Sequence, residues 1–254
     1  MDLSTALVLS AGGLRGAAHV GVLRQLVRNG VAIDAIVGVS AGAVIAAYYA
    51  AVGLTIDELI DDAAKFRGRH LLAYSANVQL GYRFEPRLRS RCGVIPERLR
   101  QLDTATFDRL HHGVRELGIV CHDLRSRRPR YFATGSHPDV SLSDVVRASA
   151  SIPYLFPPIS VSSGGEEMDL TDGGVSDPVP LAFARSAAIG ATHIIVSDCR
   201  WLGRTRQDDS TTVWIRPRMF STGTLWGPRH GLTAAVRDGE RAVTNAILEQ
   251  LSTW

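Results

Sequence analysis

The 254-residue sequence lacks the features that mark several protein classes. Its three cysteines, Cys92, Cys121 and Cys199, are far apart and form neither a CxxC pair nor a metal-ligand spacing with histidine, so we expect neither a disulfide framework nor a bound metal. No apolar run approaches the roughly 18 residues of a membrane-spanning helix. The N-terminus lacks the positive charge and the apolar length of a signal peptide, and a cytoplasmic location is therefore expected.

A large excess of charge is also missing. Lysine and arginine together number 28, aspartate and glutamate 25, and the net charge is +3, which provides no electrostatic case for nucleic-acid binding. Hydrophobic residues make up 45% of the chain and charged residues 21%, the balance of a globular protein. A chain of this length can bury one sizeable core, and no repeat or linker interrupts it. Residues 1–254 are therefore predicted to form a single domain.

Apolar segments of two kinds alternate along the chain. Residues 6–10 and 33–39 are short apolar runs typical of buried parallel strands, whereas residues 16–29 and 41–52 are apolar at helical spacing or throughout. This alternation of strands and helices predicts an α/β fold. Further strands are expected at residues 117–122, 131–134, 193–197 and 212–215, and further helices near residues 57–62 and at 142–149, 180–189 and 232–251.

A candidate nucleophile lies in residues 38–42, Gly-Val-Ser-Ala-Gly, which fit the GxSxG pattern between an apolar strand and an apolar helix. A sharp turn of this kind exposes the hydroxyl of Ser40. Gly38 and Gly42 remove the Cβ atoms that would clash with the neighbouring strand and helix. The following helix N-terminus directs free amides and a partial positive charge toward the same point. The alternative is a tight turn with an incidental serine.

A glycine-rich turn joins the first predicted strand to the first predicted helix. Residues 10–16 read Ser-Ala-Gly-Gly-Leu-Arg-Gly, and the spacing of Gly12, Gly13 and Gly16 does not fit the dinucleotide fingerprint GxGxxG. Bare backbone amides at Gly12 and Gly13 instead suit an oxyanion hole, where each donor typically lowers a barrier by about 3–4 kcal/mol. Arg15 is expected to hold either the loop or an anionic group of the substrate. A plain glycine-rich turn is the alternative.

A serine nucleophile needs a base, and histidine is the usual one. The chain has eight histidines, of which none lies in a loop with the Gly or Asp signals that commonly surround a catalytic histidine. Those considered as partners of Ser40 are His19, His111, His112 and His193. We expect all four to be structural, with His193 kept as the base of an alternative Ser–His pair.

Asp172 is the better candidate for the base, in the sequence Asp-Gly-Gly with Gly173 and Gly174. The two glycines free the backbone, so that the carboxylate can project from a loop toward the catalytic centre. A carboxylate can accept the serine proton directly if partial desolvation raises its pKa. An ordinary Asp-Gly hairpin turn is the competing interpretation.

These three motifs, in this order, resemble the patatin-like phospholipases, which combine a glycine-rich oxyanion loop, a GxSxG elbow and a downstream Asp-Gly-Gly. Residues 17–23, 148–153 and 156–158 also look like the family, so the resemblance covers most of residues 5–190. One departure is the start of the loop, where the family often has a longer glycine run and this chain has Ser10-Ala11. The oxyanion donors are therefore expected at Gly12 and Gly13.

The resemblance implies a three-layer α/β/α sandwich with a central, mostly parallel sheet. It also implies hydrolysis of acyl esters of phospholipids or other lipids through an acyl-enzyme on Ser40, with Asp172 as general base and with no metal or cofactor. An acyltransferase or a small-ester esterase would use the same acyl-enzyme. A non-catalytic lipid-binding module is the alternative from outside the enzymes.

Residues 67–116, rich in arginine, glycine and proline, are predicted to form short helices and loops that cover the site. Within residues 67–100 only Glu85 and Glu97 are acidic, and aromatic residues are interleaved with arginines. The arginines of this segment are Arg67, Arg69, Arg83, Arg87, Arg89, Arg91, Arg98 and Arg100. Because guanidinium groups pair with phosphate and aromatic rings favour the membrane interface, peripheral contact with an anionic membrane is predicted here. A solvated, arginine-biased insertion is the simpler alternative.

Overall fold

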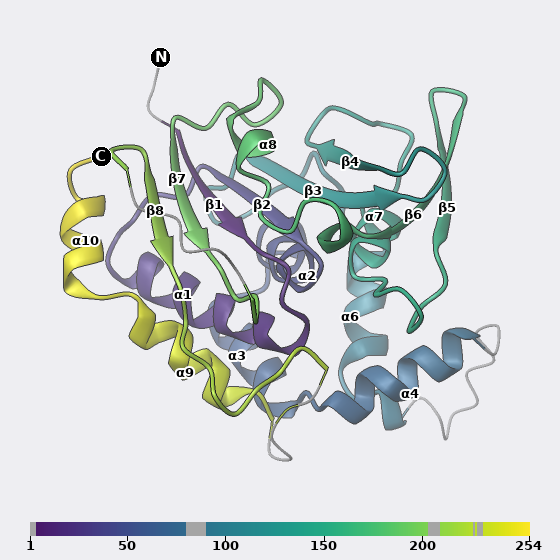
Figure 1. Ribbon diagram of the computed structural model, residues 1–254, viewed down its shortest axis with the longest axis horizontal. Coiled ribbons are helices and arrows are strands. Elements are labelled where there is room, and N and C mark those ends of the chain that lie inside the picture. The colour runs from purple at the N-terminus through teal and green to yellow at the C-terminus, as the bar shows by residue number, and fades with distance from the viewer. Residues whose placement is uncertain (1–3, 80–89, 203–208, 226, 228–230) are drawn as a thin grey trace.

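The computed structural model describes residues 4–79, 90–202, 209–225, 227 and 231–254, and its described strands form one mixed sheet with helices on both sides (Figure 1). The sheet order is β5-β6-β3-β2-β1-β7-β8, and β4 pairs with β3 off this path. The strands are β1 (Thr5–Leu9), β2 (Ala35–Val39), β3 (Glu116–Asp123), β4 (Arg128–Ala133), β5 (Ile159–Ser163), β6 (Glu166–Asp172), β7 (His193–Ser197) and β8 (Thr212–Ile215). The α/β prediction is confirmed.

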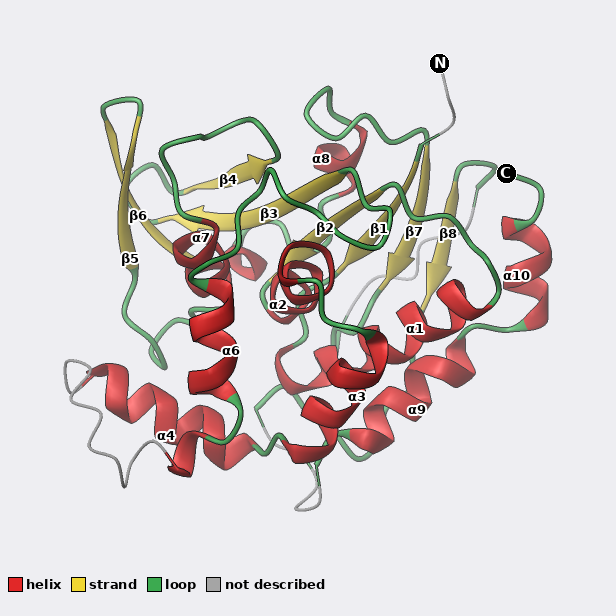
Figure 2. Cartoon of the chain, turned by 180° about the vertical axis from the view of Figure 1, so that it is seen from behind, coloured by secondary structure: helices red, strands yellow, loops and turns green. Residues whose placement is uncertain are grey.

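The helices divide unequally between the two faces of the sheet. Helices α1, α2, α3, α7 and α9 lie in front of the sheet in Figure 2, and α8 covers part of the other face. The α-helices are α1 (Ala17–Arg28), α2 (Ala41–Ala47), α3 (Ile56–Lys65), α4 (Gly68–Gln79), α6 (Ile95–Leu102), α7 (Leu142–Ser149), α8 (Leu181–Arg185), α9 (Thr233–Ala242) and α10 (Asn245–Leu251). Short helical turns are η1 (Gly13–Gly16), η2 (Tyr48–Val52), η3 (Ser90–Cys92) and η4 (Gly173–Val175).

Strand alternation divides the core between these two faces. Leu7 and Leu9 of β1 join the larger apolar cluster, which the helices α1, α2, α3, α7 and α9 complete. Ala6 and Val8, which point the other way, join the smaller cluster around Phe183 of α8. These four residues are fully buried, so after Thr5 the strand is a continuous apolar run instead of alternating in polarity, as expected for a parallel strand covered on both faces.

The edges of β3 determine where the site forms. β4 occupies one edge along residues 118–123. The opposite edge is shared, because β2 pairs in parallel as far as Val120 and β6 pairs antiparallel from Cys121 onward. The end of β2 and the end of β6 therefore meet head-on beside β3. Ser40, which follows β2, and Asp172, the last residue of β6, are brought together at this junction.

Three sequence-based assignments need correction. The helix predicted at residues 232–251 is two helices, because Val243 is extended and the Thr244 side chain caps α10 by accepting from the Ile247 amide. The helix predicted at residues 180–189 is the five-residue α8. The hairpin of β5 and β6 was missed. Its turn, with Gly164 and Gly165 at positive φ, carries a Gly-Gly signal that could have revealed it.

None of the helices formed by the described residues combines the length and the apolar character needed to cross a membrane.

Candidate active site

Ser40 lies in the sharp turn between β2 and α2. Its backbone has φ 56° and ψ −121°, a region in which a residue with a side chain is strained by about 1–3 kcal/mol. The glycines on both sides allow this turn. A Cβ at Gly38 would approach the Gly42 carbonyl oxygen to 2.5 Å, and one at Gly42 would approach the Leu9 carbonyl oxygen to 2.2 Å. The GxSxG pattern therefore serves close packing of strand, turn and helix.

Asp172 accepts a hydrogen bond from the Ser40 hydroxyl. Ser40 Oγ lies 2.7 Å from Asp172 Oδ2, and Asp172 Oδ1 accepts from the Gly174 amide at 2.8 Å. Burial raises the pKa of the Asp172 carboxyl to about 6, and the two hydrogen bonds oppose this rise. A carboxylate with this pKa is ionised at neutral pH and has more affinity for a proton than an exposed aspartate.

The structure corrects the predicted setting of Asp172. It ends β6 and is followed by the turn η4, so it projects from a strand end instead of a loop, and no hairpin forms at Asp-Gly. A Cβ at Gly173 would lie 2.2 Å from the Val120 carbonyl oxygen. Gly173 is therefore needed for the close approach of η4 to β3, and it keeps Asp172 beside Ser40.

Ser149 supports the turn and was missed by sequence reasoning. The Ser40 amide donates to Ser149 Oγ at 2.9 Å, and the same hydroxyl donates to the Val120 carbonyl at 2.6 Å. Ser149 is fully buried at the end of α7, so it ties that helix to the turn and to β3. Residues 148–153 look like the corresponding stretch of the family, but they contain no signal that the Ser149 hydroxyl contacts the Ser40 turn.

The glycine-rich loop lies beside Ser40. Gly13 has φ +57°, and a Cβ there would lie 2.2 Å from the Thr224 carbonyl oxygen. A Cβ at Gly16 would meet that of Ala41 at 2.4 Å, so η1 packs directly on the start of α2. In the part of the chain that the structure describes, the amides of Gly12 and Gly13 donate to no acceptor. Gly13 also lines the cavity onto which Ser40 opens, whereas Gly12 packs against Cys199.

Arg15 holds this loop from behind. Its guanidinium is buried and donates to the carbonyls of Cys199, Met219 and Thr222 at 2.9–3.2 Å. The Trp201 ring also lies over it, 5.0 Å from centroid to guanidinium carbon. Of the two roles expected for Arg15, these contacts support anchoring of the loop. Burial lowers its pKa from the ordinary value.

The histidines take structural places. His19 Nδ1 lies 2.7 Å from Ser197 Oγ and its Nε2 2.9 Å from the Ser10 carbonyl, beneath the glycine-rich loop. Burial lowers the pKa of His19 to about 4, so the ring is neutral. His193 begins β7 opposite Thr5, at the amino end of the parallel strands, whereas Ser40 follows the carboxyl end of β2. The alternative Ser–His pair therefore lacks contact.

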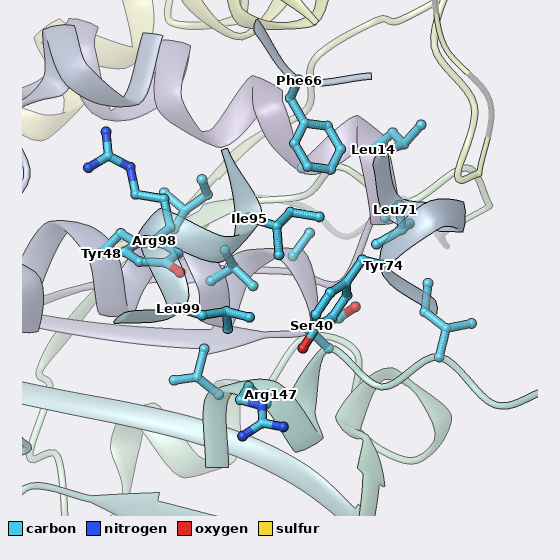
Figure 3. Close-up of a pocket in the computed structure, with 18 of the residues that line it drawn as sticks. Leu14, Ser40, Tyr48, Phe66, Leu71, Tyr74, Ile95, Arg98, Leu99 and Arg147 are labelled. Carbon is cyan, nitrogen blue, oxygen red and sulfur yellow. The ribbon is translucent and has the colours of Figure 1, made fainter. Parts of the chain in front are cut away.

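A cavity of about 580 Å³ opens onto Ser40 (Figure 3). Its walls come from η1, α2, α3, α4, α6, α7 and residues 150–159, so helices of the predicted cover line it. Most of the lining is apolar, including Leu14, Val44, Ile45, Phe66, Leu71, Val78, Ile95, Leu99, Ile152 and Phe156. In Figure 3, Tyr74 and Arg147 lie on the Ser40 side, and Tyr48 and Arg98 lie toward the other end.

The arginines of residues 67–100 differ in their surroundings. Arg98 forms a two-pronged ion pair with Asp62 at 2.6 and 3.0 Å, and Arg100 pairs with Glu97. Arg67 donates to the carbonyls of Ala64 and Phe66, just before this segment, whereas Arg69 and Arg91 are exposed. Arg83, Arg87 and Arg89 lie outside the described residues. Membrane contact through this segment stays a prediction.

The sequence matches a known family model over residues 7–185, described as patatin-like phospholipase. An uncharacterised NTE family protein of Mycobacterium tuberculosis (strain H37Rv) is 28% identical over 228 residues, which are 87% of this chain and 57% of that protein. A second one from the same strain is 32% identical over 181 residues, covering 70% of this chain and 27% of the relative. The chain thus spans about half or less of their lengths.

Two further relatives extend the comparison. Mouse patatin-like phospholipase domain-containing protein 6 is 31% identical over 203 residues, which cover 76% of this chain and 13% of that protein. The crystal structure of VipD from Legionella pneumophila matches all of this chain and 67% of its own, with a TM-score of 0.56 and 15% identity, a likeness that shows the fold. With the family model covering most of the chain, the protein belongs to the patatin-like phospholipase family.

Proposed function

We propose that this protein is a serine acyl hydrolase that cleaves acyl esters of lipids, with Ser40 as nucleophile and Asp172 as general base. The single observation that carries the proposal is the 2.7 Å hydrogen bond from Ser40 Oγ to Asp172 Oδ2 at the wall of an apolar cavity. Family membership supports the same class of reaction.

The chemistry follows from the positions of these groups. Asp172 Oδ2 takes the proton of Ser40 Oγ as this oxygen attacks the ester carbonyl carbon. The negative charge that forms on the carbonyl oxygen is stabilised by the amides of Gly12 and Gly13. The protonated Asp172 then returns its proton to the departing alkoxide, and an acyl ester on Ser40 remains. Water attacks this ester while Asp172 takes a proton from the water, and Asp172 then passes that proton to Ser40 Oγ as the tetrahedral intermediate collapses, which releases the fatty acid and restores Ser40.

The pKa of Asp172 suits both halves of the cycle. At about 6 it lies close to neutral pH, so the carboxylate accepts the serine proton more readily than an exposed aspartate would and still gives it up to the leaving group. The desolvation that raises this pKa comes from the burial of the carboxylate, which ends β6 where η4 packs closely on β3.

The cavity favours a long acyl group over a short, soluble one. Its volume falls within the 300–1,000 Å³ typical of pockets that enclose drug-sized ligands, and its lining is mostly apolar. Burial of methylene groups there contributes about 0.8 kcal/mol each. An acyltransferase would use the same acyl-enzyme, with an alcohol or amine in place of water, whereas a non-catalytic lipid-binding protein would need only the cavity.

A labelling experiment with an activity panel tests the proposal. Wild-type protein is expected to react covalently with a fluorophosphonate at Ser40 and to release fatty acid from micellar phospholipid, at rates that rise with acyl length. Ser40→Ala should lose both, and Asp172→Asn should lose turnover. Label on another serine, or unchanged hydrolysis by Ser40→Ala, contradicts the assignment. Ester formation with an added alcohol in preference to hydrolysis identifies the acyltransferase.

A further inference from the structure

Large apolar side chains are exposed on four segments, of which residues 66–79 and 151–158 contribute to the lining of the cavity and the other two pack beside the glycine-rich loop. Six of the nine such side chains that are exposed in the described residues lie on residues 66–79, 151–158, 198–202 and 216–225. They are Leu72, Tyr154, Trp201, Leu202, Phe220 and Leu225. Tyr154 is fully exposed, and Leu202 and Phe220 are 82% and 87% exposed. Exposed apolar groups gathered in this way mark an interaction surface.

Two of these segments follow the carboxyl ends of β7 and β8 and pack against the oxyanion loop. The Thr224 carbonyl accepts from the Leu14 amide at 2.8 Å, and Arg15 binds carbonyls in both segments, including those of Cys199 and Thr222. The Trp201 ring covers the guanidinium of Arg15. Residues 198–202 and 216–225 are therefore held together beside the Gly12–Gly13 end of the site.

The other two segments carry the surface across the cover of the cavity. The Leu155 carbonyl accepts from the Ser75 hydroxyl and from Gln79 Nε2, the latter at 3.0 Å, which fastens residues 151–158 to α4. At its opposite end α4 begins at Gly68, where a Cβ would lie 3.4 Å from the Leu225 carbonyl oxygen. In Figure 1, β7 and β8 point to the same lower side of the molecule on which α4 lies. The four segments thus form one continuous carboxyl-edge surface.

The charge of the carboxyl-edge surface is of one sign. Its four segments contain five arginines and a single acidic residue, Asp198. Asp198 is buried and already paired with Arg200 and Arg216, whereas Arg69 and Arg218 are exposed. Exposed cations are attracted to an anionic bilayer, and exposed tryptophan and tyrosine favour the interface between lipid and water.

We propose that the carboxyl-edge surface docks the protein on an anionic phospholipid membrane, inserting Tyr154, Leu202 and Phe220 into the interface. The choice of a lipid surface rests on the proposed lipid-ester hydrolysis, because a substrate held in a bilayer must reach a cavity that two of these segments line. Docking here brings the cavity to the membrane and shortens the path of an acyl ester to Ser40. The arginine pattern favours lipid headgroups over a second copy of this positively charged surface.

The test uses the triple variant Tyr154→Ser, Leu202→Ser, Phe220→Ser and the matched control Val27→Ser. These three side chains lie outside the cavity, and Val27 is an exposed apolar residue near the end of α1. Co-sedimentation is measured with vesicles of phosphatidylcholine alone and of phosphatidylcholine mixed with phosphatidylglycerol, at low and high salt. Hydrolysis is measured on a soluble short-chain ester and on vesicle phospholipid, and thermal unfolding checks the fold.

Wild type and Val27→Ser are expected to bind the anionic vesicles, and binding should weaken with salt. The triple variant should bind at least about tenfold more weakly and lose vesicle hydrolysis in proportion, with soluble-ester hydrolysis unchanged. Equal vesicle binding by the triple variant overturns the inference. The inference is also overturned if wild type forms a dimer and binds no vesicles, while the triple variant is monomeric. That result assigns the surface to contact with a second copy of the chain. If wild type binds vesicles but hydrolyses neither ester substrate, the proposed activity is refuted and the docking surface is retained.

Discussion

Replacing Asp172 by asparagine should abolish turnover and at the same time stabilise the fold at neutral pH. Asparagine keeps the shape and can still accept from the Gly174 amide, but it cannot take the serine proton. The wild-type carboxylate is destabilised by burial, which raises its pKa from the ordinary value of 3.8 to about 6. At about 1.4 kcal/mol for each pKa unit, ionised Asp172 lowers the free energy of unfolding by about 3 kcal/mol.

The sign of this effect depends on pH. The folded protein keeps the Asp172 proton up to about pH 6, whereas the unfolded chain releases it near pH 3.8. Between these values the folded state binds more protons, so the free energy of unfolding falls as the pH rises. The destabilisation caused by ionised Asp172 reaches its full value of about 3 kcal/mol at pH 7 and is only about 1 kcal/mol at pH 4.5. The gain from Asp172→Asn should shrink with it.

Urea unfolding of wild type and Asp172→Asn at pH 7 and pH 4.5 measures both quantities, and Ser40→Ala serves as the inactive control with the carboxylate intact. We expect Asp172→Asn to be more stable than wild type by up to about 3 kcal/mol at pH 7, with a clearly smaller difference at pH 4.5. A variant that is less stable than wild type at pH 7, or a difference that does not change with pH, refutes the reasoning. Residual turnover near the wild-type level would require another base.

The pH profile of kcat/KM for a soluble ester should fall about tenfold per pH unit below about pH 6, because protonated Asp172 cannot act as a base; a flat profile down to pH 5 would contradict this. Gly13→Val should lower kcat by about 100-fold with a smaller change in KM, because the added side chain displaces an oxyanion donor, and a pure KM effect would limit the loop to binding. Ser149→Ala removes the acceptor of the buried Ser40 amide and a donor to the Val120 carbonyl, so we expect a loss of about 1–3 kcal/mol in the free energy of unfolding and a lower kcat of the folded protein, whereas unchanged steady-state kinetics would make Ser149 purely structural. His193→Ala should keep full activity, and a marked loss would restore the Ser–His pair.

The features that the sequence predicted correctly are local ones. The GxSxG turn between β2 and α2 is the clearest case, because a Cβ at Gly38 would meet the Gly42 carbonyl oxygen four residues away. The close approaches that require Gly42 and Gly13 involve Leu9 and Thr224, so there the sequence shows the glycine but not its distant neighbour. The buried strands β1 and β2 were evident from unbroken apolar runs. Such signals survive without tertiary context where a short segment contains both the steric demand and the residue that meets it, as at Gly38.

The sequence motifs paired Ser40 with Asp172, but only the tertiary structure decided how these distant groups come into contact. Ser40 and Asp172 are 132 residues apart, and their contact follows from β6 taking the edge of β3 that β2 leaves free. Strand pairing, the Ser149 bridge and the anchoring of Arg15 by the carbonyls of Cys199, Met219 and Thr222 all depend on burial and register summed over many residues. The pKa of Asp172 has the same origin, because desolvation is a property of the packed surroundings and leaves no trace in the local sequence.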